Sequence, residues 1–182
     1  GVVFPVYILD QVHGEDHLPG GASRWWLHHS LKALNESLQN KLNFFAGDPL
    51  KILQELSAEH EFSGIFWNRC YEPWVMERDA SIKTYFREQG KVVESFNGSL
   101  LWEPMMVLKQ DGTPYRVFTP FYRKGCLNAP PPRLPLPVPS AINLFKSESS
   151  KSLESLELLP KIRWDIKLGS YWNISEDGGH QR

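Results

Sequence analysis

The sequence predicts an α/β fold with a doubly wound, mostly parallel sheet of the Rossmann-like type, followed by a long extended linker. Three observations lead to this prediction. Short apolar runs are typical of buried strands, the stretches between them have a helical apolar period, and the two kinds of segment alternate along the chain. Strands joined by helical crossovers are parallel, because the crossover returns the chain to the same end of the sheet.

The first strand is expected in the apolar run from Val2 to Leu9, and Asp10 ends it. Both alternating faces of this run are apolar, as in a strand covered on both sides, although Pro5 cannot donate a hydrogen bond to a ladder. A loop from 11 to 21 follows. Ser23 is then expected to cap a helix, whose apolar stripe is made of leucines at spacings of 4, 3 and 4: Leu27, Leu31, Leu34 and Leu38.

The second strand is expected at residues 42–46. Directly after it, Gly47-Asp48-Pro49 predicts a helix start, with Asp48 as the N-cap and Pro49 at the first helical position. Leucines at positions 50, 53 and 56 would carry this helix onto the sheet.

The second half of the predicted sheet repeats the pattern. Residues 65–67 form a third strand that ends at Asn68, and a helix over 75–89 is stopped by Gly90. A fourth strand starts at Val92. Four strands separated by three helices support the doubly wound interpretation.

The composition changes after Phe121. Residues 130–139 hold six of the 14 prolines, and residues 147–155 are rich in serine and glutamate. Both segments are typical of an extended linker and not of a core. We therefore predict an α/β domain over residues 1–122 and an interdomain linker over residues 123–182.

Composition excludes several classes of protein. The net charge of −1 argues against a stand-alone nucleic-acid binder, and no apolar run is long enough to cross a bilayer. Cys70 and Cys126 form no CxxC pair, which argues against a disulfide scaffold or a zinc site and suits a reducing cytoplasm. No nucleophile-elbow, P-loop or metal-binding histidine motif occurs, so we assign no catalytic and no metal-ligating residue.

Candidate binding residues follow from the sheet. Ligands of such folds bind outside the carboxyl ends of the strands. Asn68, Arg69 and Glu72 place an amide, a guanidinium and a carboxylate within five residues there, a set that suits a heterocycle. An equally weighted alternative is structural: Asn68 caps a turn, and Arg69 pairs with Glu72 or Asp79. The predicted cofactor-binding set is Asp10, Arg24, Asn68, Arg69 and Glu72.

Four stretches resemble the DNA photolyase/cryptochrome family. The clearest is W-N-R-C-Y-E-P-W at 67–74, followed by Arg78-Asp79. S-R-W-W-L-H-H-S-L at 23–31 is similar to the family's arginine-led helix, and G-T-P-Y-R-V-F-T-P-F at 112–121 to its F-T-P-F signature. Trp172 with S-E-D-G-G at 175–179 resembles the segment that leads into the catalytic half.

The resemblance implies a two-part protein. In this family an N-terminal α/β domain holds a light-harvesting antenna chromophore, and a helical C-terminal domain holds FAD and the damaged DNA. Excited, reduced FAD donates an electron to a pyrimidine dimer, which splits. We expect this chain to be the antenna domain and linker of a monomeric, class I type cyclobutane-dimer photolyase. The family's opening strand and its FAD domain would lie outside this chain, which alone would be inactive.

The resemblance also orders the candidate antennae. Glu72 matches a carboxylate of deazaflavin-type members, whereas the amide and carboxylate of folate-type members would fall at Trp74 and Val75 and are not matched. A deazaflavin or flavin is therefore favoured over a folate, and an empty site stays open. Two other functions also stay open: a cryptochrome-type blue-light photoreceptor, and a nucleotide-binding α/β module, which would lack the W-N-R-x-Y-E-P and F-T-P-F strings.

Overall fold

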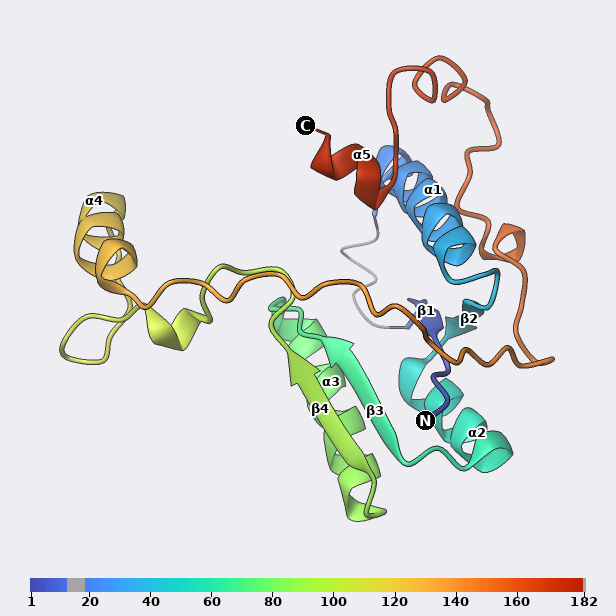
Figure 1. Cartoon of the computed structure of the whole chain (residues 1–182), viewed down its shortest axis with the longest axis horizontal. Coiled ribbons are helices and arrows are strands. Elements are labelled where there is room, and N and C mark those ends of the chain that lie inside the picture. Colours follow the sequence, from blue (N-terminus) through green and yellow to red (C-terminus); the bar gives the residue numbers. More distant parts are fainter. Residues whose placement is uncertain (13–18, 182) are drawn as a thin grey trace. The chain divides into compact units, whose positions relative to one another are not determined.

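The computed structural model describes residues 1–12 and 19–181 (Figure 1). Most of the loop predicted at 11–21 lies outside the described residues. The chain forms two compact units. The first unit consists of Gly1–Glu61 with Pro139–Arg182, and the second unit is Phe62–Val138.

The first unit contains a parallel pair of strands. Strand β1 (Val6–Asp10) pairs with β2 (Asn43–Gly47) along its whole length, and helix α1 (Gly21–Ser37) connects them (Figure 1). Helix α2 (Pro49–His60) follows β2. Its predicted cap is confirmed, because the Asp48 Oδ1 atom accepts a hydrogen bond of 2.9 Å from the backbone N–H of Leu50.

Helix α1 starts earlier than predicted. Its N-cap is Gly20, and the backbone N–H of Arg24 already bonds to the Gly20 carbonyl at 3.0 Å, so Ser23 lies inside the first turn and the predicted cap is wrong. The predicted leucine stripe is confirmed at three positions, since Leu31 is buried and Leu27 and Leu38 pack against the same core, whereas Leu34 is 47% exposed. The stripe left out two further buried residues of α1, Trp25 and His28.

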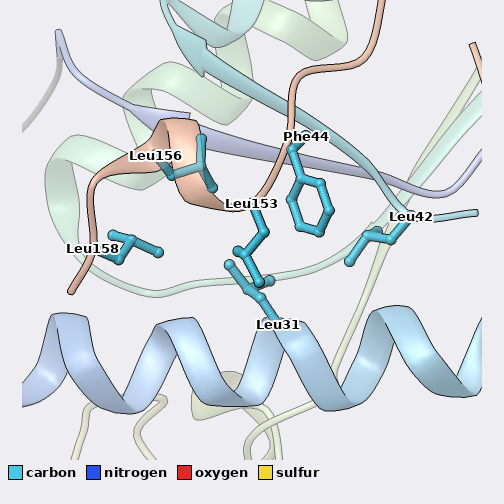
Figure 2. Close-up of a cluster of buried hydrophobic side chains, with 6 residues drawn as sticks. All are labelled: Leu31, Leu42, Phe44, Leu153, Leu156 and Leu158. Atoms are coloured by element: carbon cyan, nitrogen blue, oxygen red, sulfur yellow. The ribbon is translucent and has the colours of Figure 1, made fainter. Parts of the chain in front are cut away.

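The core of the first unit is a cluster of six buried side chains (Figure 2): Leu31, Leu42, Phe44, Leu153, Leu156 and Leu158. Half of them come from the short segment 153–158, which includes a 3₁₀ turn at Glu154–Leu156. The expectation that residues 147–155 contribute no core is therefore wrong. Serine and glutamate dominate the composition of that stretch, but leucines spaced two or three residues apart are buried behind them.

Asn43 holds residues 145–147, which precede the segment 153–158, to the sheet. Its side chain is fully buried, and Nδ2 donates to the carbonyls of Pro5 at 3.0 Å, Lys41 at 3.0 Å and Phe145 at 3.1 Å. Oδ1 accepts from the Ser147 N–H at 2.9 Å. Pro5 precedes β1 and acts only as an acceptor, so its missing N–H costs the ladder nothing.

The second unit repeats the parallel pairing. Strand β3 (Gly64–Asn68) pairs with β4 (Val92–Phe96), and helix α3 (Pro73–Glu88) connects them (Figure 1). The stop at Gly90 is confirmed, because this residue has a φ of +75°, which favours glycine. The core of this unit is built on Phe86, which is fully buried, with Val75, Ile82 and Val93.

The α/β class predicted from the sequence is confirmed, with parallel strands joined by helices. The four strands form two two-stranded sheets, β1–β2 and β3–β4. Two short helices lie further along, α4 (Phe118–Pro120) and α5 (Glu176–His180). The predicted boundary at residue 122 stays a prediction. Among the described residues, no helix combines the length and the apolar character that crossing a membrane requires.

Candidate functional site

The candidate site lies in the second unit, where β3 and β4 end. Asn68 is the last residue of β3, and the backbone N–H of Arg69 donates to the Phe96 carbonyl at 2.8 Å. This bond continues the ladder by one residue and fixes Arg69 beside the end of β4. Glu72 follows as the N-cap of α3. We call Asn68, Arg69 and Glu72 the rim, together with the side chains bonded to Arg69 directly or through Ser95, which are Ser95, Glu103 and Lys83.

Arg69 is held by three side-chain hydrogen bonds. Nη1 donates to Glu103 Oε1 at 2.6 Å, Nη2 to the Ser95 carbonyl at 2.6 Å, and Nε to Ser95 Oγ at 3.2 Å. Tyr71 donates its hydroxyl to the other Glu103 oxygen at 2.9 Å. The carboxylate that pairs with Arg69 is therefore Glu103, not Glu72 or Asp79, so the pairing in the structural alternative is wrong.

Asp79 has other partners. It is 7% exposed, and Oδ2 accepts from the indole N–H of Trp67 at 2.7 Å. Its other oxygen forms an ion pair of 2.7 Å with Arg78. The bond between Trp67 and Asp79 connects the end of β3 to the beginning of α3. Neither contact of Asp79 uses the Arg69 side chain.

Asn68 and Glu72 are less constrained. The Asn68 side chain packs directly against Gly98, where an added Cβ would come within 2.4 Å of its Cγ atom. Within the described part of the chain, the structure records no side-chain hydrogen bond of Asn68. Glu72 is exposed and accepts from the Tyr71 N–H at 3.2 Å. The Asn68 amide and most of the hydrogen-bonding capacity of the Glu72 carboxylate are thus available to a ligand.

The other two predicted residues belong to the first unit. Asp10 accepts a hydrogen bond of 3.0 Å from the Val12 N–H, and Arg24 donates to the carbonyl of Glu157. The structure brings together Asn68, Arg69 and Glu72. The convergence of Asp10 and Arg24 with them stays a prediction.

The chemistry available at the rim is binding chemistry. Cys70 is exposed, and its pKa is raised, first by desolvation and then by the Glu72 carboxylate, so the thiol is kept protonated and is a poor nucleophile. Among residues 1–12 and 19–181, no three histidine, cysteine or acidic side chains lie close enough together to hold a metal ion. What the rim offers is an amide, a carboxylate and two cations beside aromatic rings.

A hollow of about 280 Å³ in the first unit is a weaker candidate. It lies between α1 and residues 169–175, and its walls include Trp25, His29 and Trp172. Its volume falls below the ~300–1,000 Å³ of typical ligand pockets, and none of the five predicted binding residues lines it.

Comparison with known proteins identifies the family. The sequence model described as DNA photolyase matches residues 1–140. The chain belongs to the DNA photolyase family. This confirms the resemblance that the four sequence motifs indicated.

The relatives of this photolyase-family chain carry two kinds of name. It is 38% identical to the deoxyribodipyrimidine photo-lyase of Agrobacterium fabrum over 98% of this chain and 37% of that relative. It is 33% identical to Cryptochrome-1 of Arabidopsis thaliana over 78% of this chain and 21% of the relative. The chain thus spans little more than a third of the photolyase's length.

A solved structure matches the whole photolyase-family chain. It is a bacterial class III photolyase from Agrobacterium tumefaciens, with a TM-score of 0.79 and 37% identity, and the match covers 100% of this chain and 38% of that one. The fold is thus that of a photolyase α/β domain. The solved relative is a class III photolyase, whereas the motifs predict class I. The subclass of this chain stays a prediction.

Sequence reasoning missed three residues of the photolyase-family rim: Lys83, Ser95 and Glu103. Two of them carried a local signal. Ser95 interrupts the apolar face of β4 that also bears buried Val93, and Lys83 follows buried Asp79 by one helical turn. Glu103 carried none, because it lies 34 residues from Arg69 along the chain and outside every helix and strand that the sequence predicts.

Proposed function

We propose that this chain is the light-harvesting domain of a deoxyribodipyrimidine photo-lyase, an enzyme that repairs pyrimidine dimers in DNA by light-driven electron transfer from FAD. Membership of the family and the 38% identity to the Agrobacterium fabrum photo-lyase support the proposal. Because the chain spans about a third of that relative, the repair activity belongs to the longer enzyme. FAD and damaged DNA would be held by residues outside this chain.

The rim is the observation that carries the antenna role. Ligands of parallel α/β sheets bind at the carboxyl ends of the strands. At the carboxyl ends of β3 and β4, Glu103 fixes the Arg69 side chain. Beside it lie the Asn68 amide, which has no recorded hydrogen bond among the described residues, and the exposed Glu72 carboxylate. Because Arg69 is held in place before binding, little of its side-chain entropy is lost when a flat heterocycle binds beside it.

The antenna we propose is a deazaflavin or a flavin in preference to a folate, on the strength of Glu72. Asn68 and Glu72 would bond to the polar edge of the ring, and Asp10 and Arg24 would complete the site. Residues 1–122 would form the antenna-binding domain, and residues 123–182 would lead towards the FAD-binding domain of a monomeric enzyme. A cytoplasmic location is part of the proposal, on the basis of two free cysteines.

A ligand titration tests the antenna proposal. The natural-length protein is titrated with FMN, a deazaflavin and a reduced folate, and binding is followed by ligand fluorescence. Glu72→Ala should weaken binding of the preferred ring by roughly 1–3 kcal/mol, the scale of leaving a buried partner unpaired. Glu77→Ala is the matched control, because Glu77 is an exposed glutamate one turn further along α3.

Each outcome of this titration has a meaning. Equal affinity in wild type and Glu72→Ala removes Glu72 from the site. Tight folate binding without flavin binding reverses the proposed order of ligands. No binding of any ring contradicts the antenna role.

A cryptochrome-type photoreceptor is the second candidate, because Cryptochrome-1 of Arabidopsis thaliana matches 78% of this chain at 33% identity. A repair assay distinguishes the two. Light-dependent loss of dimers from DNA by the natural-length protein identifies a photolyase, and its absence with FAD bound identifies the photoreceptor.

A further inference from the structure

Two cations of the rim converge on one serine hydroxyl. Lys83 Nζ lies 2.7 Å from Ser95 Oγ, and Arg69 Nε lies 3.2 Å from the same atom. A serine oxygen can accept two hydrogen bonds and donate one. Ser95 therefore accepts from both cations and keeps its own O–H, for which the described residues supply no recorded acceptor.

In the part of the chain that the structure describes, the two cations of the rim, Arg69 and Lys83, are not both paired with a carboxylate. Arg69 is neutralised by Glu103 at 2.6 Å. Asp79, a carboxylate whose charge acts on Lys83, is already engaged by Arg78 and by the Trp67 indole. Among the described residues, no carboxylate forms an ion pair with Lys83. One positive charge at the rim is thus left uncompensated.

The partly buried surroundings of Lys83 make its unpaired positive charge less favourable. Lys83 is half-buried, with its ammonium 5.4 Å from the centre of the Trp67 ring. Its pKa is lowered from the ordinary value, first by desolvation and then by the positive charge of Arg69. Placing a second cation beside Arg69 is unfavourable for folding. A purely structural role would be served by a neutral side chain donating to Ser95.

We propose that Lys83, Arg69 and the Ser95 hydroxyl bind an oxyanion, the phosphate or carboxylate tail of the ring ligand at the rim. The identity of the ring rests on the proposed function, whereas the oxyanion site rests on the geometry of these three residues. Lys83 has two further N–H donors, Arg69 has two, and Ser95 has one. An oxyanion would accept from them and neutralise the surplus charge.

A pair of ligands that differ only in the phosphate tests this site. FMN and riboflavin share the ring, so their affinity ratio for the natural-length protein isolates the phosphate. We expect FMN to bind about tenfold more tightly or better, the scale of a hydrogen bond to a charged group. A reduced folate and its pterin ring alone form the corresponding pair for a carboxylate tail, and they show which oxyanion the site takes.

The matched variants are Lys83→Gln and Lys91→Gln. Lys91 also donates to an oxygen, the Phe62 carbonyl at 2.8 Å, and its ammonium lies 4.7 Å from the centre of the Phe62 ring. In the described part of the chain, no recorded bond connects Lys91 to a rim residue. Lys83→Gln should abolish the preference for the ligand with the tail, Lys83→Arg should restore it, and Lys91→Gln should leave it unchanged. Far-UV circular dichroism verifies that each variant is folded.

Inorganic pyrophosphate gives a measurement that needs no ring. Its affinity should fall as the pH rises through the lowered pKa of Lys83, because the ammonium loses its charge there, and Lys83→Gln should remove this part of the pH dependence. Pyrophosphate binding without ring binding would keep the oxyanion site and contradict the antenna role. Equal affinities for each ligand pair with no pyrophosphate binding would overturn the oxyanion site and leave the ring site standing.

Discussion

Asn43→Ala is expected to destabilise the first unit by about 2–4 kcal/mol, because a buried side chain with several hydrogen bonds is lost. The fully buried side chain makes four hydrogen bonds. Its removal leaves the buried N–H of Ser147 without its acceptor and the Phe145 carbonyl without its donor, whereas the Pro5 carbonyl keeps the backbone N–H of Asn43 at 2.9 Å. Each unsatisfied buried group costs roughly 1–3 kcal/mol. The costs do not add fully, because water enters the vacated space.

Urea unfolding followed by circular dichroism and tryptophan fluorescence measures this effect. Asn35→Ala is the matched control in the same unit. Asn35 is only half-buried and bonds to Asn40 and Leu42, five and seven residues away, so its loss should cost about 1 kcal/mol. A loss below 1 kcal/mol for Asn43→Ala would show that the segment at 145–147 is not held by this side chain.

Leu156→Ala is expected to cost about 2–5 kcal/mol, the range for deleting a buried leucine side chain. Leu156 is 4% exposed and packs in the core cluster of the first unit (Figure 2). A linker residue would show no such effect. The substitution therefore measures whether the serine- and glutamate-rich stretch belongs to the folded unit.

Leu134→Ala provides the contrast. Leu134 also follows Phe121 in the chain, but it lies in the proline-rich stretch and is 82% exposed, so its truncation should change the free energy of unfolding by less than about 0.5 kcal/mol. Similar small effects at both positions would return residues 153–158 to the linker.

The elements that could be predicted from the sequence are those with local signals. Asp48 and Pro49 mark the start of α2 within two residues, and Gly90 marks the end of α3 by its backbone conformation. The start of α1 was misplaced because Gly20 begins the helix without a side-chain cap, so a serine three residues later looked like the better signal. The core leucines at 153–158 were missed because composition was averaged over a window in which they are a minority.

The site shows the same division. Asn68, Arg69 and Glu72 could be proposed from the sequence because ligands bind at strand ends in this fold class, and their role in binding stays a prediction. The partner of Arg69 was not found, because Glu103 reaches it across 34 residues of sequence. The surplus charge at Lys83 could be recognised only from the distances to Ser95, since a lysine on a helix is ordinarily solvated.

The most direct test of an antenna at the rim is the chromophore content of the natural-length protein isolated from its own host. The chromophores are released by denaturation and separated by chromatography with absorbance detection. We expect two, FAD and a second ring, with the second strongly reduced in Glu72→Ala and Lys83→Gln, unchanged in Glu77→Ala, and FAD unchanged in all three. A second chromophore retained at the wild-type level in both rim variants would contradict binding at this site.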